Sequence, residues 1–445
     1  MNVHAAVGTV SVGLSFILCA ASHLAAQNPI AIAAQSPPMQ GDELKFVAVI
    51  SRHGVRSPTG KLDQLNRYSR QPWPAWSVPP AYLTEHGYKL MTQFGSYDRE
   101  LWTKQGLLTS SDCAEANRIT IIADSDQRTR QTGKALAAGI APGCIIDVHA
   151  LPEGTTDPLF HSLEAGVGSP DKLLATAAIS GRIGANPQGI ASAYRSQLEA
   201  LEEVLRGCTS EPDCAPASKA ESLFDSPSSI GPGKGDHLVD LRSPLGIASS
   251  MTEDLLLEYA EGMKITDVGW GRVDGQKLRA LLQLHCASED IERRTGYVAR
   301  VQSSNMLFHL LKSMEQAVSG LPVQDALSRP EDRILLLVGH DTNISNIAGT
   351  LGLNWLIDGR RDDTPPGGAL VFELWKKHDS TGYSVRTYYT AQTIEEMRSA
   401  TPLSLAQPPE RAPLFVPGCS LADDSCPWKA FQQAMQAAVD PAFAK

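Results

Sequence analysis

The chain has 445 residues, a net charge of −10 at pH 7, and 42% hydrophobic and 20% charged residues. This length suits one large domain with a second one, and the composition excludes a disordered chain. The negative charge argues against nucleic acid as a partner, because a phosphate backbone is recognised by a basic surface. A local cluster of arginines in so acidic a chain indicates a small anion in a pocket.

The first 34 residues carry no Asp, Glu, Lys or Arg, and Val10–Ala26 is an apolar stretch that ends in small residues. This pattern is typical of a secretory signal peptide, with cleavage near Ala26 or near Ala34. An uncleaved anchor is the alternative, but the apolar run is short for a membrane span. We therefore predict a signal peptide over residues 1–34 and a periplasmic or secreted protein.

Eight cysteines fit an oxidising compartment. Cys19 lies in the predicted signal peptide, and we interpret Cys286 as a buried free thiol on a helix. Position suggests three disulfide pairs: Cys113 with Cys144, Cys208 with Cys214, and Cys419 with Cys426.

The N-terminal half alternates predicted strands and helices. Consecutive apolar residues over Leu44–Ile50 predict a strand buried on both faces, and residues 58–82, rich in Pro and Trp, predict an irregular loop. Thr84 is the predicted N-cap of a helix that runs to about Lys104. The next predicted elements are the strand Arg118–Ala123, a helix from a Ser125 or Asp126 cap to about Ile140, and the strand Ile145–Val148. This order of elements argues for a parallel sheet.

The middle of the chain is predicted to be mostly helical. Apolar side chains recur at helical spacing at Ile190, Tyr194, Leu198, Leu201 and Leu205, and further helices are predicted near 249–262, 273–286 and 296–318. Residues 207–246 are rich in Gly, Ser, Pro and Cys and predict an excursion between helices. Strands return at Arg333–Val338, Ala369–Trp375 and Tyr383–Tyr389. We therefore expect an α/β domain built from residues 35–164 and 291–445, with a helical cap domain inserted over residues 165–290.

Polar residues gather where three predicted parallel strands end, and open α/β sheets bind ligands at that edge. The three groups are Arg52, His53, Arg56 and Thr59; Asp124 to Arg130; and Gly339 to Asn343. Their shared placement is more informative than any one of them alone.

The residue types in these groups suit the transfer of a phosphoryl group. Guanidinium groups of Arg52 and Arg56 can neutralise phosphate oxygens, with Arg128 or Arg130 and the ring of His340 as further donors. His53 can then attack phosphorus and form a phosphohistidine. Asp341 can protonate the leaving group and later activate water. Because arginines serve as the charge sink, we expect no metal and no cofactor.

Simpler interpretations of the same residues remain open at this stage. Arg52 and Arg56 could form ordinary surface ion pairs, and His53 alone could be a core or surface histidine. Asp341 could be no more than the N-cap of a helix.

The chain resembles the histidine acid phosphatase family. The R-H-G-x-R-x-P signature stands at Arg52–Pro58, and the distal H-D pair is His340-Asp341. Further tracts are similar to the periplasmic bacterial phytase branch, which includes the glucose-1-phosphatases: residues 121–124, 128–130, 270–272, 339–343, 364–368 and 401–405. The resemblance covers essentially residues 35–430.

This resemblance implies a phosphoglycerate-mutase-like α/β fold, a mostly parallel sheet flanked by helices, with an inserted helical cap. It implies a catalytic set of Arg52, His53, Arg56, Arg128, His340 and Asp341. It also implies substrate-side positions at Thr59, Asp124, Glu253 and His285, and the cysteine pairing above fits the family. Gly60 departs from the pattern, because phytases of this branch often place a lysine there.

We predict a monomeric acid phosphatase that acts on a small phosphomonoester, with phytate (myo-inositol hexakisphosphate) as the first choice of substrate. A glucose-1-phosphatase or a broad-specificity acid phosphatase is the alternative within this class. A non-catalytic inositol-phosphate-binding protein is the alternative from another class. No nucleic acid or membrane partner is expected.

Overall fold

The computed structural model describes residues 41–445 except 61, 109–112, 208–219, 236, 379 and 381. The predicted signal peptide and the predicted Cys208–Cys214 pair lie outside the described residues. The other two predicted disulfides, Cys113–Cys144 and Cys419–Cys426, are present. Among the described residues, no helix has both the length and the apolar character that crossing a membrane requires.

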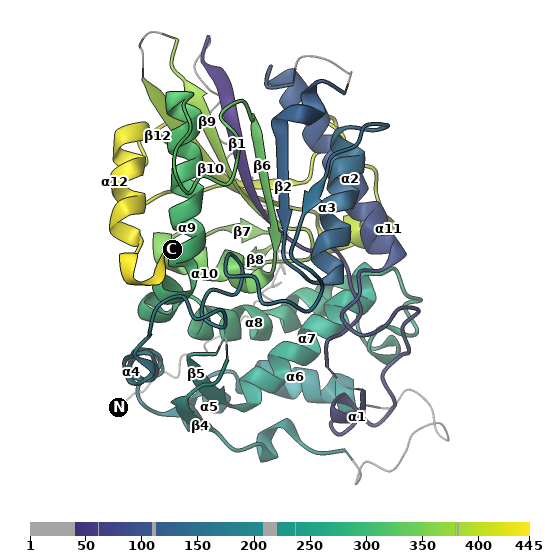
Figure 1. Cartoon of the computed structure of the whole chain (residues 1–445). Helices are drawn as coiled ribbons and strands as arrows, with labels where there is room; N and C mark the ends of the chain where they lie inside the picture. Colours follow the sequence, from purple (N-terminus) through teal and green to yellow (C-terminus); the bar gives the residue numbers. More distant parts are fainter. Residues whose placement is uncertain are drawn as a thin grey trace, which may run out of the picture. The chain divides into compact units, whose positions relative to one another are not determined.

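The core of the fold is a mixed eight-stranded sheet (Figure 1). Its strand order is β11-β10-β9-β1-β6-β2-β3, with β12 paired to β10. Strands β1, β6, β2 and β3 run parallel, whereas β9 to β12 add antiparallel pairs on the other side of β1. The strands of this sheet are β1 Glu43–Arg52, β2 Ile119–Ala123, β3 Val148–His149, β6 Ile334–Gly339, β9 Ala369–Lys376, β10 Tyr383–Ala391, β11 Glu410–Pro413 and β12 Ser425–Pro427.

Helices cover both faces of this sheet, which explains why its strands are apolar on consecutive positions. Phe46, Ala48 and Ile50 of β1 belong to one apolar core, and Val47 and Val49 belong to the other. The first core includes residues from α9 (Gly296–Ser319), α10 (Asp341–Leu351) and α12 (Trp428–Ala438). The second includes residues from α2 (Glu85–Lys104) and α3 (Gln127–Ile140).

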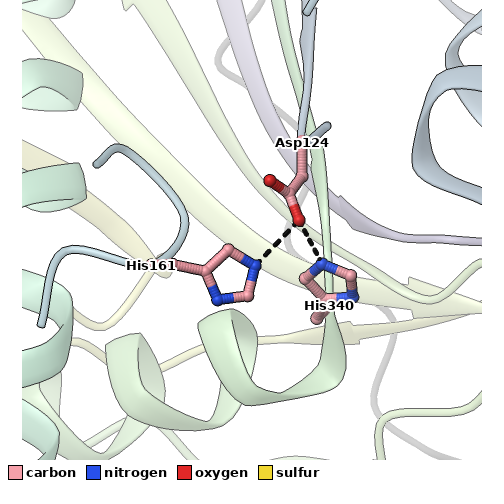
Figure 2. Close-up of side chains that lie close together, drawn as sticks. All are labelled: Asp124, His161 and His340. Carbon is pink, nitrogen blue, oxygen red and sulfur yellow. Dashed lines mark hydrogen bonds and ion pairs between the residues drawn. The ribbon is translucent and has the colours of Figure 1, made fainter. Parts of the chain in front are cut away.

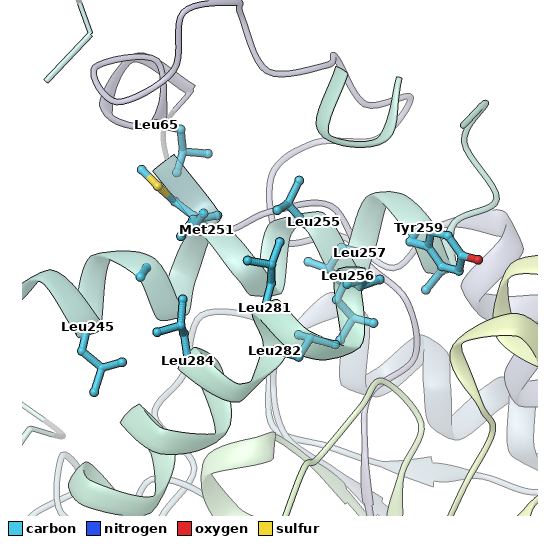
Figure 3. Packing of buried hydrophobic residues seen from close by; sticks show 14 of the residues in the cluster. Leu65, Leu245, Met251, Leu255, Leu256, Leu257, Tyr259, Leu281, Leu282 and Leu284 are labelled. Carbon is cyan, nitrogen blue, oxygen red and sulfur yellow. The ribbon is translucent and has the colours of Figure 1, made fainter. Parts of the chain in front are cut away.

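A third apolar core lies in the mostly helical middle of the chain. Figure 3 shows its leucines on α7 (Pro244–Ala260) and α8 (Gly275–Glu292) packing between the two helices. The other helices and strands of this part are α4 Lys172–Arg182, α5 Pro187–Ala193, α6 Arg195–Arg206, β4 Ser229–Pro232 and β5 Val239–Arg242. The remaining short elements are α1 Leu62–Leu65, β7 Leu356–Ile357, β8 Arg360–Arg361 and α11 Ile394–Ser399, and α1 and α11 also contribute apolar side chains to this core. This core also includes Leu90 of α2, Ile394 of α11 and Phe443 near the C-terminus, so it extends beyond the predicted cap, and the domain division at residues 165 and 290 remains a prediction.

Most predicted elements agree with the structure, and the differences have local reasons. Thr84 caps α2 as predicted, because its side chain accepts a hydrogen bond from the amide of Gly87. The strand predicted over Ile145–Val148 is wrong in extent, since pairing with β2 begins only at Val148. The helical pattern around Tyr194 is split between α5 and α6, because the backbone at Tyr194 leaves the helical region.

Candidate active site

The ends of three parallel strands bring the three predicted polar groups together. Arg52 at the end of β1 pairs in register with Gly339 at the end of β6, and the amide of His53 donates to the carbonyl of Gly339 at 2.9 Å. The amide of Asp124, just after β2, donates to the carbonyl of Val338 at 3.0 Å. The predicted meeting of these residues at the carboxyl edge of the sheet is thereby confirmed.

The loop that follows β1 is held against helix α2. The amide of Thr84 donates to the carbonyl of Val55 at 3.1 Å. A Cβ at Gly87 would lie 2.1 Å from that same carbonyl oxygen, so only glycine allows this close approach. This packing holds the backbone of the loop against α2 at Val55, two residues after His53.

A cavity of about 380 Å³ opens at this edge of the sheet. His53, Arg56, Arg128, His340 and Asp341 line it, as does the predicted substrate-side residue Thr59. The lining among the described residues does not include Asp124, Glu253 or His285, the other three predicted substrate-side residues. These three instead contact residues around the cavity.

His53 has the form of a nucleophile. Its Nδ1 atom lies 2.9 Å from the carbonyl oxygen of Gly54, and because a carbonyl oxygen only accepts hydrogen bonds, Nδ1 must carry the proton and donate. That hydrogen bond leaves Nε2 with the lone pair. Burial and the positive charges of Arg128, Arg52 and Arg56 hold the pKa of His53 well below its ordinary value. The imidazole is therefore neutral and able to attack an electrophile.

Arg52 is fully buried and tied to two carboxylates. Its guanidinium donates to the Thr364 carbonyl at 2.5 Å and pairs with Glu253 and with Asp341, whose Oδ2 lies 2.9 Å away. Burial on its own would raise the pKa of Asp341. The charge of Arg52, with further charges from His285 and Arg56, outweighs burial and holds this pKa well below its ordinary value. In this arrangement the Asp341 carboxyl is ionised.

Asp341 is not the N-cap of α10, so this alternative interpretation is wrong. The cap is His340, which forms a capping box with Asn343, and its amide donates to Asn343 Oδ1 at 2.9 Å. Asp341 is the first helical residue and projects toward Arg52. The cap therefore leaves the Asp341 carboxylate available for other contacts.

The structure also separates the two arginines of the second group. Arg128 lines the cavity and pairs with Asp126 Oδ2 at 2.6 Å, whereas Arg130 is partly exposed and lies 3.8 Å from Glu153. The pairing with Arg128 explains why the Asp126 side chain makes no capping hydrogen bond at the start of α3. Arg128 is thus the third arginine beside His53.

His340 belongs to a hydrogen-bonded group that includes one unforeseen residue. A single oxygen of Asp124, Oδ2, accepts from His340 Nε2 at 2.6 Å and from His161 Nε2 at 2.8 Å, as Figure 2 shows. Burial on its own would raise the pKa of Asp124, but these two hydrogen bonds outweigh burial and hold the pKa below its ordinary value. His161 also lines the cavity. The sequence marks His161 only as a residue of the loop after β3, because no regular spacing relates it to Asp124 or His340.

Glu253 and His285 come from the helical part of the chain. Glu253 on α7 pairs with Arg52 and, at 3.2 Å, with Arg56, so it lies behind the arginines. His285 on α8 pairs through Nδ1 with the Ser249 hydroxyl at 3.0 Å, and its buried Nε2 has no hydrogen-bond partner among the described residues. Both side chains support the site from the side opposite the sheet.

Two sets of side chains have the composition of a metal site: Asp124, His161 and His340; and Glu253, His285 and Asp341. The carboxylate of the first set already accepts from both of its imidazoles. The carboxylates of the second set both pair with Arg52. Neighbouring guanidinium groups oppose a further cation, so we interpret the first set as a hydrogen-bonded network and the carboxylates of the second set as ion-pair partners of Arg52.

Comparison with known proteins finds full-length relatives. The family described as "Histidine phosphatase superfamily (branch 2)" matches residues 43–390. Phytase AppA of Escherichia coli (strain K12) is 36% identical over 425 residues, which cover 93% of this chain and 96% of the relative. Glucose-1-phosphatase of Salmonella typhimurium is 28% identical over 413 residues, covering 92% and 95%. The apo structure of Hafnia alvei phytase is 34% identical with a TM-score of 0.82, covering 91% of this chain and 99% of that one.

Proposed function

Because this chain belongs to branch 2 of the histidine phosphatase superfamily and is therefore a phosphoric monoester hydrolase, we propose that it works through a phosphohistidine on His53. The observation that carries the proposal is the neutral His53 ring, whose Nδ1 bonds to Gly54 while arginines surround it. Family membership favours an enzyme over the alternative of a non-catalytic binding protein. The residue roles given below are our proposal.

In the first step, His53 Nε2 attacks phosphorus and the bond from phosphorus to the ester oxygen breaks. Arg52, Arg56 and Arg128 neutralise the phosphoryl oxygens, while the N–H of the His340 ring stays bonded to Asp124 and its Nδ1 faces Arg128. Asp341 gives its proton to the departing oxygen. The substrate dianion competes for Arg52, which raises the proton affinity of Asp341 and makes it a donor.

In the second step, water attacks the phosphohistidine. Asp341, now ionised, takes a proton from the water, and the bond between phosphorus and nitrogen breaks. Inorganic phosphate leaves and His53 is neutral again. The cycle balances without a redox partner.

Trapping the intermediate tests this mechanism. A labelled phosphomonoester mixed with the enzyme and quenched in alkaline denaturant should leave label on His53, because phosphohistidine survives base. The control is His53→Ala, which should retain no label. Wild-type enzyme that turns over substrate without any labelled histidine would reject the mechanism, and binding without turnover would favour a non-catalytic protein.

Phytate is the substrate that we propose. The support is the full-length similarity to phytases of Escherichia coli and Hafnia alvei, at 36% and 34% identity. Glucose 1-phosphate is the second candidate, supported by full-length similarity to a glucose-1-phosphatase at 28% identity. Measuring kcat/KM for both substrates on one preparation decides between them. Negligible phytate hydrolysis beside strong glucose 1-phosphate hydrolysis would reverse the ranking.

We also propose export to the periplasm or the medium, as a monomer. The disulfides Cys113–Cys144 and Cys419–Cys426 support an oxidising compartment. N-terminal sequencing of the exported protein should find cleavage near Ala26 or Ala34, and light scattering should give the mass of one chain. An intact N-terminus in the cytoplasmic fraction would contradict export.

A further inference from the structure

The cavity is lined by a cation that the proposed mechanism does not use. Arg293 directly follows helix α8 as its C-cap and lines the same cavity as His53. We propose that Arg293 binds a second anionic group of the substrate, so that it selects substrates with several phosphates over those with one. This inference rests on the proposed function, because it concerns the substrate class of the same site.

The Arg293 guanidinium is poorly satisfied. Its nearest carboxylate oxygen among the described residues is Glu289 Oε1 at 3.8 Å, beyond hydrogen-bond distance from Nε. Its Nε is buried without a partner there. By contrast, Arg56 and Arg128 each hold a carboxylate at 3.2 and 2.6 Å. A buried guanidinium nitrogen without a partner is costly, and an anion in the cavity would satisfy it.

Acidic conditions weaken even the long Glu289 contact. Burial raises the pKa of Glu289, and the negative charge of Asp341 raises it further. The positive charge of Arg293 lowers this pKa but does not outweigh burial. As pH falls, this carboxyl loses its charge before an ordinary glutamate does. Arg293 then has less compensation from the protein and more to gain from a ligand.

The adjoining wall offers a second unsatisfied donor. Asn346 Nδ2 donates to Gln302 Oε1 at 3.2 Å, and both residues line the cavity. Gln302 Nε2 and Asn346 Oδ1 are then buried without partners. If both side-chain amides were rotated by 180°, Gln302 would donate and Asn346 would accept, and the NH2 group of Asn346 would then be the one without an acceptor. An anion held by Arg293 would supply that acceptor.

The size of the cavity agrees with a polyanion. At about 380 Å³ it falls in the range of roughly 300–1,000 Å³ that small-molecule sites occupy. One phosphate held by Arg56 and Arg128 would leave room for a second near Arg293. A substrate with a single phosphate would meet only the first group of cations.

Competitive inhibition tests the inference without relying on turnover of a chosen substrate. The probes are myo-inositol hexakis sulphate, a polyanion, and inorganic phosphate, each measured against hydrolysis of p-nitrophenyl phosphate. Arg293→Gln should raise the Ki of the hexakis sulphate about tenfold, the effect expected for one charged hydrogen bond. It should change the Ki of phosphate and the KM of p-nitrophenyl phosphate less than about twofold.

Two further variants serve as controls. Arg293→Lys keeps the charge at the end of α8 and should fall between wild type and Arg293→Gln. Arg195→Gln removes an exposed arginine that pairs with Glu199 on α6, and should leave both Ki values unchanged. Equal changes in the two Ki values, or a result matching Arg195→Gln, would overturn the role of Arg293. Wild-type enzyme that fails to hydrolyse phytate would overturn only the proposed substrate, because the two Ki values can still be measured.

Discussion

The Asp341 carboxylate lies 2.9 Å from a guanidinium nitrogen of Arg52, the residue directly before the proposed nucleophile in the chain. This ion pair holds the proposed general acid in its ionised form while the site is empty. The same arginine is a proposed ligand of the phosphate. We therefore expect substrate binding to set the protonation of Asp341, because the phosphate would compete for Arg52 and add negative charge beside the carboxylate.

We expect the rate to be maximal on the acidic side of neutrality. The pKa of His53 is well below its ordinary value, so the ring stays unprotonated and nucleophilic into the acidic range. At higher pH, Asp341 in the substrate complex loses the proton that it must donate. The profile of kcat against pH for an alkyl phosphate should thus fall toward neutrality, and a maximum above pH 7 would contradict the assignment.

Asp341→Asn should separate substrates by their leaving groups. Alkyl phosphates need a proton on the departing oxygen, and their kcat should fall by about 10²–10⁴. Aryl phosphates have better leaving groups and should lose much less. Parallel assays of an alkyl phosphate and p-nitrophenyl phosphate provide the comparison, and equal losses would remove Asp341 from the role of general acid.

Glu253→Gln should destabilise the empty enzyme and strengthen its response to phosphate. Loss of this carboxylate leaves Arg52 with Asp341 alone and removes the ion-pair partner of Arg56 among the described residues, at a cost of about 1–3 kcal/mol in the free energy of unfolding. Inorganic phosphate should then raise the Tm of the variant more than that of wild type, because the anion replaces the missing charge.

The pH dependence of this effect has a defined sign. Burial on its own would raise the folded-state pKa of Glu253. The positive charges of Arg56 and Arg52 outweigh burial, so this pKa is lowered. Its stabilisation is therefore complete above the ordinary glutamate pKa of about 4.3 and is lost as pH falls through the lower folded value. Urea unfolding at several pH values measures it. Glu199→Gln, in an exposed pair with Arg195, is the matched control and should change stability by less than about 0.5 kcal/mol; a similar change in both variants would count against the buried pair.

His161→Phe should raise the pKa of His340. In wild type, burial lowers that pKa, the hydrogen bond to Asp124 opposes it, and the charges of Arg128 and His161 lower it further. Without His161, Asp124 Oδ2 accepts from His340 alone. NMR titration of the His340 ring gives the measurement, and Asp124→Asn should shift the pKa in the opposite direction. An unchanged pKa in His161→Phe would show that the shared oxygen does not couple the two rings.

The elements that carry the site could be predicted because their signals are local. Consecutive apolar residues over Leu44–Ile50 require a strand covered on both faces, and Thr84 can satisfy an amide at the start of α2 without any distant contact. Polar residues directly after parallel strands lie at one edge of the sheet, because the carboxyl ends of such strands are on the same side. Arg52, His53, Asp124 and His340 were predictable together for this reason.

Contacts between distant segments were not predictable from spacing. Arg128 and Arg130 are equivalent as first-turn cations, and only the packing of α3 turns Arg128 toward His340 and Arg130 toward Glu153. His161 reaches Asp124 from a loop, and Arg293 reaches the cavity from the end of α8. A hydrogen bond from Nδ1 to the Gly54 carbonyl leaves Nε2 as the nitrogen of His53 that we propose to react.

By itself, the sequence predicted the central strands of the sheet, the Thr84 cap of α2 and the side chains that we propose to react, since backbone preference and burial act over a few residues. The tertiary structure decided which carboxylate each arginine holds, which nitrogen of His53 is free, and which cations line the cavity. Those choices depend on distances between segments as far apart as Arg52 and Asp341, and only the packed sheet and helices set such distances.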